Sequence, residues 1–139
     1  MIELDNRTSL EVDTKLLDSI AHIFTKKEIE LIVTNEDEMQ EINNTQRGID
    51  KATDVLSFPY EDMPMSPLGS IVICSLHVES IAKELGHSRE NELTLLFIHG
   101  LLHLVGFDHE VDNGEMREEE KKLIEKFNLP KSLIIRTQG

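Results

Sequence analysis

The chain has 139 residues, of which 39% are apolar and 29% are charged, and these values fit one folded domain with a hydrophobic core. It carries 14 Lys and Arg against 27 Asp and Glu, and the resulting net charge of −13 excludes a protein that binds RNA or an anionic membrane through a broad basic surface. Aromatic residues make up only 4% of the chain, too few for a platform on which RNA bases stack.

Three features indicate where the protein resides. Cys74 is the only cysteine, so the fold cannot depend on an intramolecular disulfide. Residues 1–7 carry charges where a signal peptide would need an apolar run. The strongly apolar segment 93–107 is shorter than the roughly 18–20 residues that span a membrane, and it contains two histidines, so it is expected to be a buried helix. We therefore expect a cytoplasmic protein.

The spacing of apolar residues predicts alternating strands and helices. Strands are predicted at residues 1–4, 28–34, 53–58 and 68–74, and the last is apolar enough to be covered on both faces. Helices are predicted from the cap Asp13 to about Thr25, in a short segment after Asn35, at 78–85 and 90–105, and from a capping box of Asp112 and Glu115 to about Phe127. The expected fold is therefore a single α+β domain over residues 1–139, with a small mixed sheet of about four strands.

Polar segments fill the remaining positions. Residues 43–52 are predicted to form a loop with Arg47 and Gly48 at its centre. The acidic segment 60–67 resembles an exposed loop, which is a candidate for a flap. The cluster Glu118, Glu119 and Glu120 lies early in the last helix and is most simply a solvated face that complements the helix dipole.

The candidate functional residues lie in and just after the apolar helix. His99 and His103 are four residues apart, so both imidazoles project from one face of the helix. Gly106 can adopt a positive φ and turn the chain so that His109 comes back toward them. Three imidazoles around one ion, with a coordination position left open, are typical of a catalytic zinc site. The alternative is that the two helical histidines are core residues bonded to carbonyls and that His109 is a loop residue.

The same spacing occurs in metzincin peptidases, in which the residue after the first histidine is a glutamate that acts as general base. This chain has Gly100 there, and glycine cannot accept a proton. The site is therefore expected to activate water for attack on a different electrophile.

Beyond the histidines, segments between about residues 40 and 110 resemble the YbeY family of bacterial metal-dependent endoribonucleases. The resemblance rests on Arg47-Gly48, Thr53-Asp54-Val55-Leu56-Ser57-Phe58-Pro59, Leu68-Gly69 with Ile71-Val72-Ile73, and the segment from His99 to His109. It implies a fold related to metallopeptidases and action on single-stranded RNA in ribosomal RNA maturation, including the 3′ end of 16S rRNA, and in ribosome quality control. It also implies that His99, His103 and His109 bind the metal and that Arg47 is the basic residue of the site. The family usually has aspartate where this chain has Ser70, so this chain has no carboxylate at that position.

Other polar residues keep two interpretations. Arg47 either contacts phosphate oxygens or is an ordinary surface residue. Asp54 and Ser57 are as easily turn and strand residues as groups that support the site, and Asp108 either orients an imidazole or stabilises the turn after Gly106. The remaining histidines are expected not to bind metal: His22 is predicted to be a surface or packed residue, and capping or solvent exposure is predicted for His77 and His87.

Three functions are therefore compared. The first is an endoribonuclease with zinc or another divalent transition metal. The second is a metallohydrolase of another substrate, such as a peptidase. The third is a ribosome assembly factor whose metal is mainly structural. Because the protein is so acidic, RNA is expected to reach it through ribosomes or ribosome-associated proteins, and no binding to DNA or membranes is expected.

Overall fold

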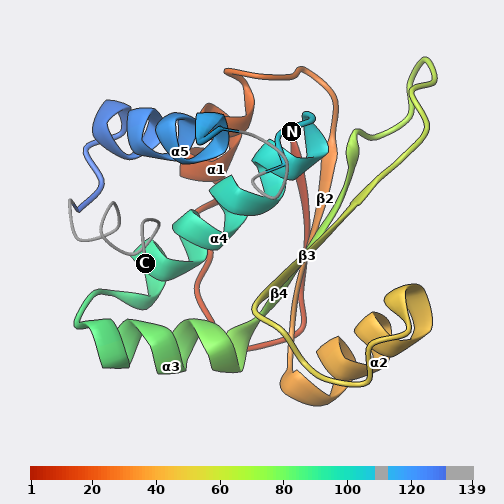
Figure 1. Cartoon of the computed structure of the whole chain (residues 1–139), viewed down its shortest axis with the longest axis vertical. Helices are drawn as coiled ribbons and strands as arrows, with labels where there is room; N and C mark the ends of the chain where they lie inside the picture. The colour runs from red at the N-terminus through yellow and green to blue at the C-terminus, as the bar shows by residue number, and fades with distance from the viewer. Residues whose placement is uncertain (109–112, 131–139) are drawn as a thin grey trace.

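The computed structural model describes residues 1–108 and 113–130. These residues form a four-stranded mixed sheet with helices on both faces, which confirms the expected α+β class (Figure 1). The strands are β1 (Ile2–Asn6), β2 (Ile29–Thr34), β3 (Val55–Pro59) and β4 (Gly69–Cys74), in the spatial order β1-β2-β4-β3. β1, β2 and β4 are parallel, whereas β3 pairs antiparallel with β4 and forms an edge of the sheet.

The part of the chain that the structure describes contains five helices. They are α1 (Thr14–Ala21), α2 (Glu36–Arg47), α3 (Ser75–Leu85), α4 (Arg89–Leu104) and α5 (Glu115–Lys126). Figure 1 shows α2 on one side of the sheet and the other four helices on the opposite side. The sheet is thus the middle layer, and α4 crosses its more heavily covered face.

The main core lies between the sheet and α4. All six residues of β4 are buried, as expected for a strand covered on both faces. Ile71 and Ile73 of β4 face the main core together with Phe97 and Leu101 of α4. Alternate residues, such as Val72, face a second cluster beneath α2 that is centred on Met39. The apolar segment 93–107 is therefore a buried core helix through Leu104, as predicted.

The prediction of a loop at residues 43–52 is wrong for the first half of that segment. Asn43 to Arg47 are helical, and α2 ends only at Gly48, which adopts φ +70°. The run Asn43-Asn44-Thr45 has weak helix propensity, which favoured a loop, but tertiary contacts outweigh that preference. Asn43 is buried and its side-chain amide donates to the carbonyl of Lys51 at 2.9 Å. Arg47 is thus the last residue of a helix instead of the centre of a loop.

Several predicted boundaries also move. α1 ends at Ala21, short of Thr25, although Asp13 caps it as predicted. α3 begins at Ser75, directly after β4, instead of at Val78. β3 starts at Val55 and includes Pro59, which an edge strand tolerates because its missing N–H removes no essential ladder bond. α5 has Gly114 as its N-cap, and Asp112 of the predicted capping box lies outside the described residues.

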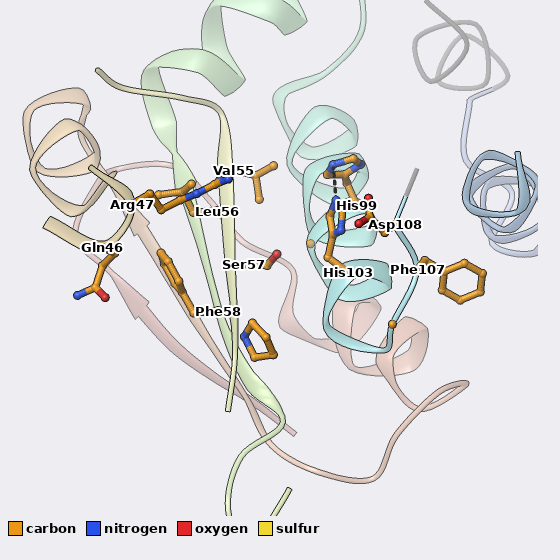
Figure 2. Close-up of a pocket in the computed structure, with 13 residues that line it drawn as sticks. Gln46, Arg47, Val55, Leu56, Ser57, Phe58, His99, His103, Phe107 and Asp108 are labelled. Atoms are coloured by element: carbon orange, nitrogen blue, oxygen red, sulfur yellow. Dashed lines mark hydrogen bonds between the residues drawn. The ribbon is translucent and has the colours of Figure 1, made fainter. Parts of the chain in front are cut away.

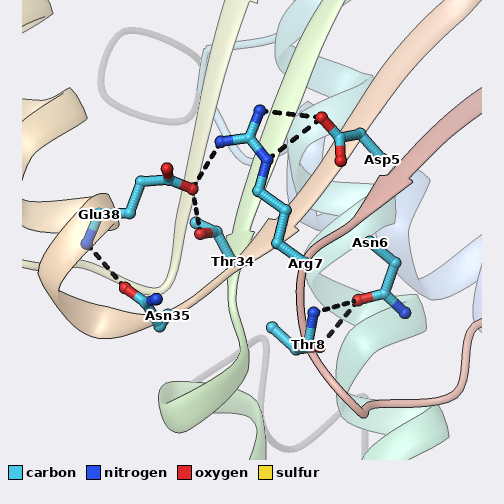
Figure 3. Close-up of polar contacts among 7 residues, drawn as sticks. All are labelled: Asp5, Asn6, Arg7, Thr8, Thr34, Asn35 and Glu38. Carbon is cyan, nitrogen blue, oxygen red and sulfur yellow. Dashed lines mark hydrogen bonds and ion pairs between the residues drawn. The ribbon is translucent and has the colours of Figure 1, made fainter.

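A polar network at the sheet edge joins β1 to α2 (Figure 3). The Arg7 guanidinium donates to Asp5 Oδ2 at 2.8 Å and to Glu38 Oε1 at 2.6 Å. Glu38 Oε1 also accepts a short hydrogen bond from the Thr34 hydroxyl, and Asn35 caps α2 through the backbone N–H of Glu38. The Thr34 hydrogen bond and the Arg7 charge lower the pKa of Glu38. The network fixes the start of α2, whose far end carries Arg47.

Segment 60–67, between β3 and β4, is exposed as predicted. Met65 is fully exposed and Met63 is 56% exposed. The Tyr60 hydroxyl donates to Glu30 Oε2 at 2.6 Å, and Lys27 donates to Asp62 at 2.6 Å, so the first part of the loop is held to the body. Its role as a flap stays a prediction. Within residues 1–108 and 113–130, no helix is long and apolar enough to cross a membrane.

Candidate metal and phosphate site

The histidine pair lies on the half-exposed side of α4. Ser88 caps this helix by accepting from the backbone N–H of Asn91 at 3.0 Å, and most of its other residues are buried. His99 and His103 lie one turn apart, as predicted, and their rings meet edge to face with centroids 4.7 Å apart. Their Nε2 atoms are 3.2 Å apart (Figure 2). Two ring nitrogens therefore converge on one point in front of the helix.

This separation fits a shared metal ion. Tetrahedral zinc with bonds of about 2.0–2.1 Å to imidazole nitrogen holds two such nitrogens about 3.3 Å apart. The two Nε2 atoms, which contact each other as a hydrogen-bonded pair, already have nearly this spacing. Residues 1–108 and 113–130 contain no group of three potential metal ligands. The predicted third ligand, His109, lies outside the described residues.

The turn after α4 has the predicted form. Gly106 adopts φ +105°, a conformation that side chains rarely permit. The backbone N–H of Gly106 donates to the carbonyl of His103 at 3.1 Å, and that of Phe107 donates to the carbonyl of Leu102 at 2.9 Å. These bonds satisfy carbonyls at the end of the helix and reverse the chain. Asp108, one residue before His109, lines the same pocket as His99 and His103.

That pocket has a volume of about 640 Å³. Its lining comes from the end of α2, from β3 and from α4 with its following turn; it comprises Gln46, Arg47, Val55, Leu56, Ser57, Phe58, Pro59, His99, Gly100, His103, Gly106, Phe107 and Asp108. Figure 2 shows β3 between Arg47 and the histidine pair. The structure thus brings Arg47 to the same pocket as His99 and His103, although more than 50 residues of chain separate them.

The other residues of the matching segments have different surroundings. Asp54 precedes β3: its Oδ1 accepts from the backbone N–H of Val55 at 2.8 Å and its carbonyl accepts from that of Cys74 at 2.9 Å. Ser57 lies on β3 and lines the pocket. Ser70 is buried on β4 and alternates with Ile71, so it faces away from the histidines. A side chain at position 70 therefore lies on the α2 side of the sheet and does not enter the histidine site, which lies on the α4 side.

Solvent exposure of the His87 side chain, one of its two predicted roles, is wrong. Its side chain is 4% exposed and lies against the fully buried Glu92, with Nε2 at 2.8 Å from Oε1. The backbone N–H of His87 donates to the carbonyl of Ala82 at 3.1 Å, which helps to cap α3 as predicted, but the short connection to α4 turns the ring into the interior. His22 is exposed and contacts the carbonyl of Asp18, as expected for a surface residue. His77 lies in the first turn of α3, where its Nδ1 is 3.3 Å from the sulfur of Cys74.

The prediction for Glu120 is also wrong. The sequence predicts a solvated face here, but Glu120 is 5% exposed and its Oε1 lies 3.2 Å from Nδ1 of His99. A signal was present in the sequence: Glu120 is four residues after Met116 and three before Leu123, both of which face the main core. Helical spacing therefore places this one glutamate of the acidic cluster on the buried side of α5.

Comparison with known proteins gives the family. The model of the family "Endoribonuclease YbeY" matches residues 3–128. A protein of Sulfurimonas denitrificans named endoribonuclease YbeY is 66% identical over all of both chains, and one of Helicobacter pylori with the same name is 54% identical over 99% of each. The solution structure of TM1509 from Thermotoga maritima superposes with a TM-score of 0.65 at 36% identity, covering 91% of this chain and 89% of the other.

These matches extend the resemblance of the motifs to almost the whole chain. They confirm the expectation of an enzyme, because the family consists of nucleases, which are hydrolases. The fold agrees as well, since the solved relative shares it. On this evidence the chain belongs to the YbeY family of endoribonucleases.

Proposed function

We propose that this protein is a metal-dependent endoribonuclease that cleaves single-stranded RNA during ribosomal RNA maturation, including the 3′ end of 16S rRNA, and in ribosome quality control. The observation that carries the proposal is the convergence of the His99 and His103 Nε2 atoms in a pocket that Arg47 also lines. Membership of a family of endoribonucleases supports RNA as the substrate. The pocket volume lies within the range of about 300–1,000 Å³ typical of small-ligand sites, which suits one segment of a nucleic acid strand.

We assign His99, His103 and His109 as the ligands of one zinc ion. The donor set supports zinc because neutral imidazole nitrogens are among its preferred ligands, although nickel, cobalt and manganese accept the same donors. When bound, such an ion acts as a Lewis acid that lowers the pKa of water and polarises a phosphoryl oxygen. The role of His99 and His103 is to present two Nε2 lone pairs from a rigid, buried helix.

Arg47 is the proposed phosphate-binding residue. Its guanidinium can donate two parallel hydrogen bonds to the non-bridging oxygens of a phosphodiester and offset the charge that develops there during cleavage. The side chain is exposed at the end of α2, so it can reach a strand that enters the pocket without first breaking a buried contact. Gly48, in the left-handed conformation, ends α2 directly after it and has no side chain to block the approach.

The charge of the whole protein restricts how RNA arrives. With a net charge of −13, long-range repulsion opposes binding of a free polyanion. The cation at the histidines and Arg47 would form a small attractive spot in an acidic surface. We therefore propose that the enzyme works in the cytoplasm on RNA delivered by ribosomes or ribosome-associated proteins, and that it cleaves isolated RNA slowly.

The test is RNA cleavage by the full chain with and without metal. A single-stranded RNA substrate should be cleaved by zinc-loaded protein, and cleavage should be lost after chelation and in His103→Ala. The matched control is His22→Ala, which removes an exposed histidine that does not line the pocket. Casein serves as a second substrate. Cleavage of casein but not RNA would favour a peptidase, and ribosome binding with no RNA cleavage would favour an assembly factor; either result overturns the proposal.

A further inference from the structure

In the acidic cluster at the start of α5, Glu120 has no role in the chemistry proposed above. Glu120 is 5% exposed, whereas Glu118 two residues earlier is exposed. A buried carboxylate is costly unless hydrogen bonds compensate for the water that it loses. Its neighbours on the same side of α5, Met116 and Leu123, are apolar core residues, so packing alone would favour another apolar side chain at position 120.

The contact with His99 provides such a hydrogen bond. The Oε1 atom of Glu120 lies 3.2 Å from the Nδ1 atom of His99. An ionised carboxylate can only accept hydrogen bonds, so Nδ1 of His99 must carry the hydrogen. A neutral imidazole with hydrogen on Nδ1 has none on Nε2. The lone pair of Nε2 is then directed to the side of the ring where Nε2 of His103 lies, 3.2 Å away.

We propose that Glu120 is a positioning residue for the site: it holds His99 in the Nδ1–H tautomer and fixes its ring so that Nε2 can bind a divalent transition-metal cation. The proposal rests on the proposed function for the presence of the cation. A carboxylate that accepts from the non-bonding nitrogen of a histidine ligand fixes the tautomer and makes the bonding nitrogen more basic. The contact also couples α5 to the site, because α5 contributes no residue to the pocket lining and Glu120 contacts His99 from behind it.

A purely structural role for Glu120 predicts a different result. If the residue only joined α5 to α4, its replacement would lower stability and leave the His99 tautomer and metal affinity unchanged. Glu120→Ala removes the acceptor, whereas Glu120→Gln has nearly the same shape and retains an oxygen that can accept from Nδ1, but lacks the charge. Glu118→Gln is the matched control, because it removes the same charge from an exposed position on the same helix.

Two measurements test the proposal on the full chain. The first is the imidazole ¹H–¹⁵N spectrum of metal-free protein, with His99 assigned by a His99→Gln variant. Wild type, Glu118→Gln and Glu120→Gln should show the Nδ1–H tautomer at His99, and Glu120→Ala should show a mixture. The second is the dissociation constant of Zn²⁺ by competition with a chelating dye. Glu120→Ala should weaken binding by about 10–100-fold, and Glu120→Gln by less.

The outcomes separate this proposal from the proposed function. Zinc binding by wild type that Glu120→Ala leaves unchanged, or an Nε2–H tautomer at His99 in wild type, overturns the role of Glu120 alone. Failure of wild type to bind zinc overturns the metal assignment itself. If Glu120→Ala does not fold, two other measurements still test the proposal: the His99 tautomer in wild type, and the zinc affinity of Glu120→Gln relative to Glu118→Gln. Equal zinc affinities of these two variants, together with an Nε2–H tautomer at His99, contradict the proposal.

Discussion

A Cβ atom on Gly100 would lie 2.9 Å from Cγ2 of Ile71, closer than real side chains approach one another. Gly100 lies on α4 between the two histidines, and Ile71 is fully buried on β4. The missing side chain therefore lets α4 sit close to the sheet at the level of the site. For the same reason, the Cβ atom of a glutamate at position 100, as in metzincins, would be too close to Ile71 of the sheet.

We expect Gly100→Ala to lower the free energy of unfolding. Alanine gains about 1 kcal/mol in helix propensity over glycine, but overpacking a core costs about 1–3 kcal/mol. Ile71 is branched at Cβ and buried, so its Cγ2 has little freedom to move away. The expected net loss is about 1 kcal/mol, measured by urea unfolding. The same substitution in an Ile71→Ala background should cost nothing or stabilise, and a stabilised single variant would contradict the close packing.

His87 and Glu92 should contribute strongly to stability. Their side chains are 4% and 0% exposed, and Nε2 lies 2.8 Å from Oε1. Removing one partner leaves a buried polar group without its hydrogen bond, so His87→Ala and Glu92→Ala should each cost about 2–4 kcal/mol. Denaturant unfolding of both single variants and of the double variant measures this. The loss of unfolding free energy in the double variant should be smaller than the sum of the losses in the two single variants, because both remove the same contact.

The exposed His22 provides the control for this pair. His22→Ala should change the free energy of unfolding by no more than about 0.5 kcal/mol, as is usual for surface substitutions. Additive losses at His87 and Glu92 would show that the two side chains do not interact. Losses no larger than that of His22→Ala would show that they are not buried in solution.

Much of this fold and site was predictable from local patterns. The strands, the buried helix with His99 and His103, and the turn at Gly106 all follow from short-range spacing that the structure retains. The two histidines are positioned by one helix, so their relation needs no knowledge of the tertiary fold. Arg47 is different: that it lines the same pocket depends on α2 and β3 packing at one edge of the sheet.

The wrong predictions for the two buried polar side chains share one physical origin. Glu120 and His87 are polar residues whose partners are contributed by another segment, His99 on α4 for the first and Glu92 on α4 for the second. Residue type alone favours the surface for both. Only a buried partner makes the interior acceptable, and such a partner is a tertiary contact that spacing along one helix does not reveal.

Cys74 should react slowly with thiol reagents in the folded protein. Its side chain is fully buried at the end of β4, and this burial raises the pKa of the thiol. Both effects lower the amount of accessible thiolate, which is the reactive form. Labelling with a chromogenic disulfide reagent at neutral pH should therefore be slow in buffer and fast in denaturant. Rapid stoichiometric labelling in buffer would show that the end of β4 is open in solution.

Arg47 should affect cleavage much more than stability. If its guanidinium offsets charge in the transition state, Arg47→Ala should lower kcat by about 10²–10³-fold with a smaller change in KM, as for other groups that stabilise developing negative charge. Arg47→Lys should recover part of the rate, because the charge remains but the paired donors do not. Since Arg47 is exposed, the free energy of unfolding should change by less than about 0.5 kcal/mol.

Lys51→Ala is the control for Arg47, since it removes an exposed cation four residues away that does not line the pocket. Equal losses of activity in Arg47→Ala and Lys51→Ala would mean that general positive charge, and not a contact from Arg47, is what the reaction requires.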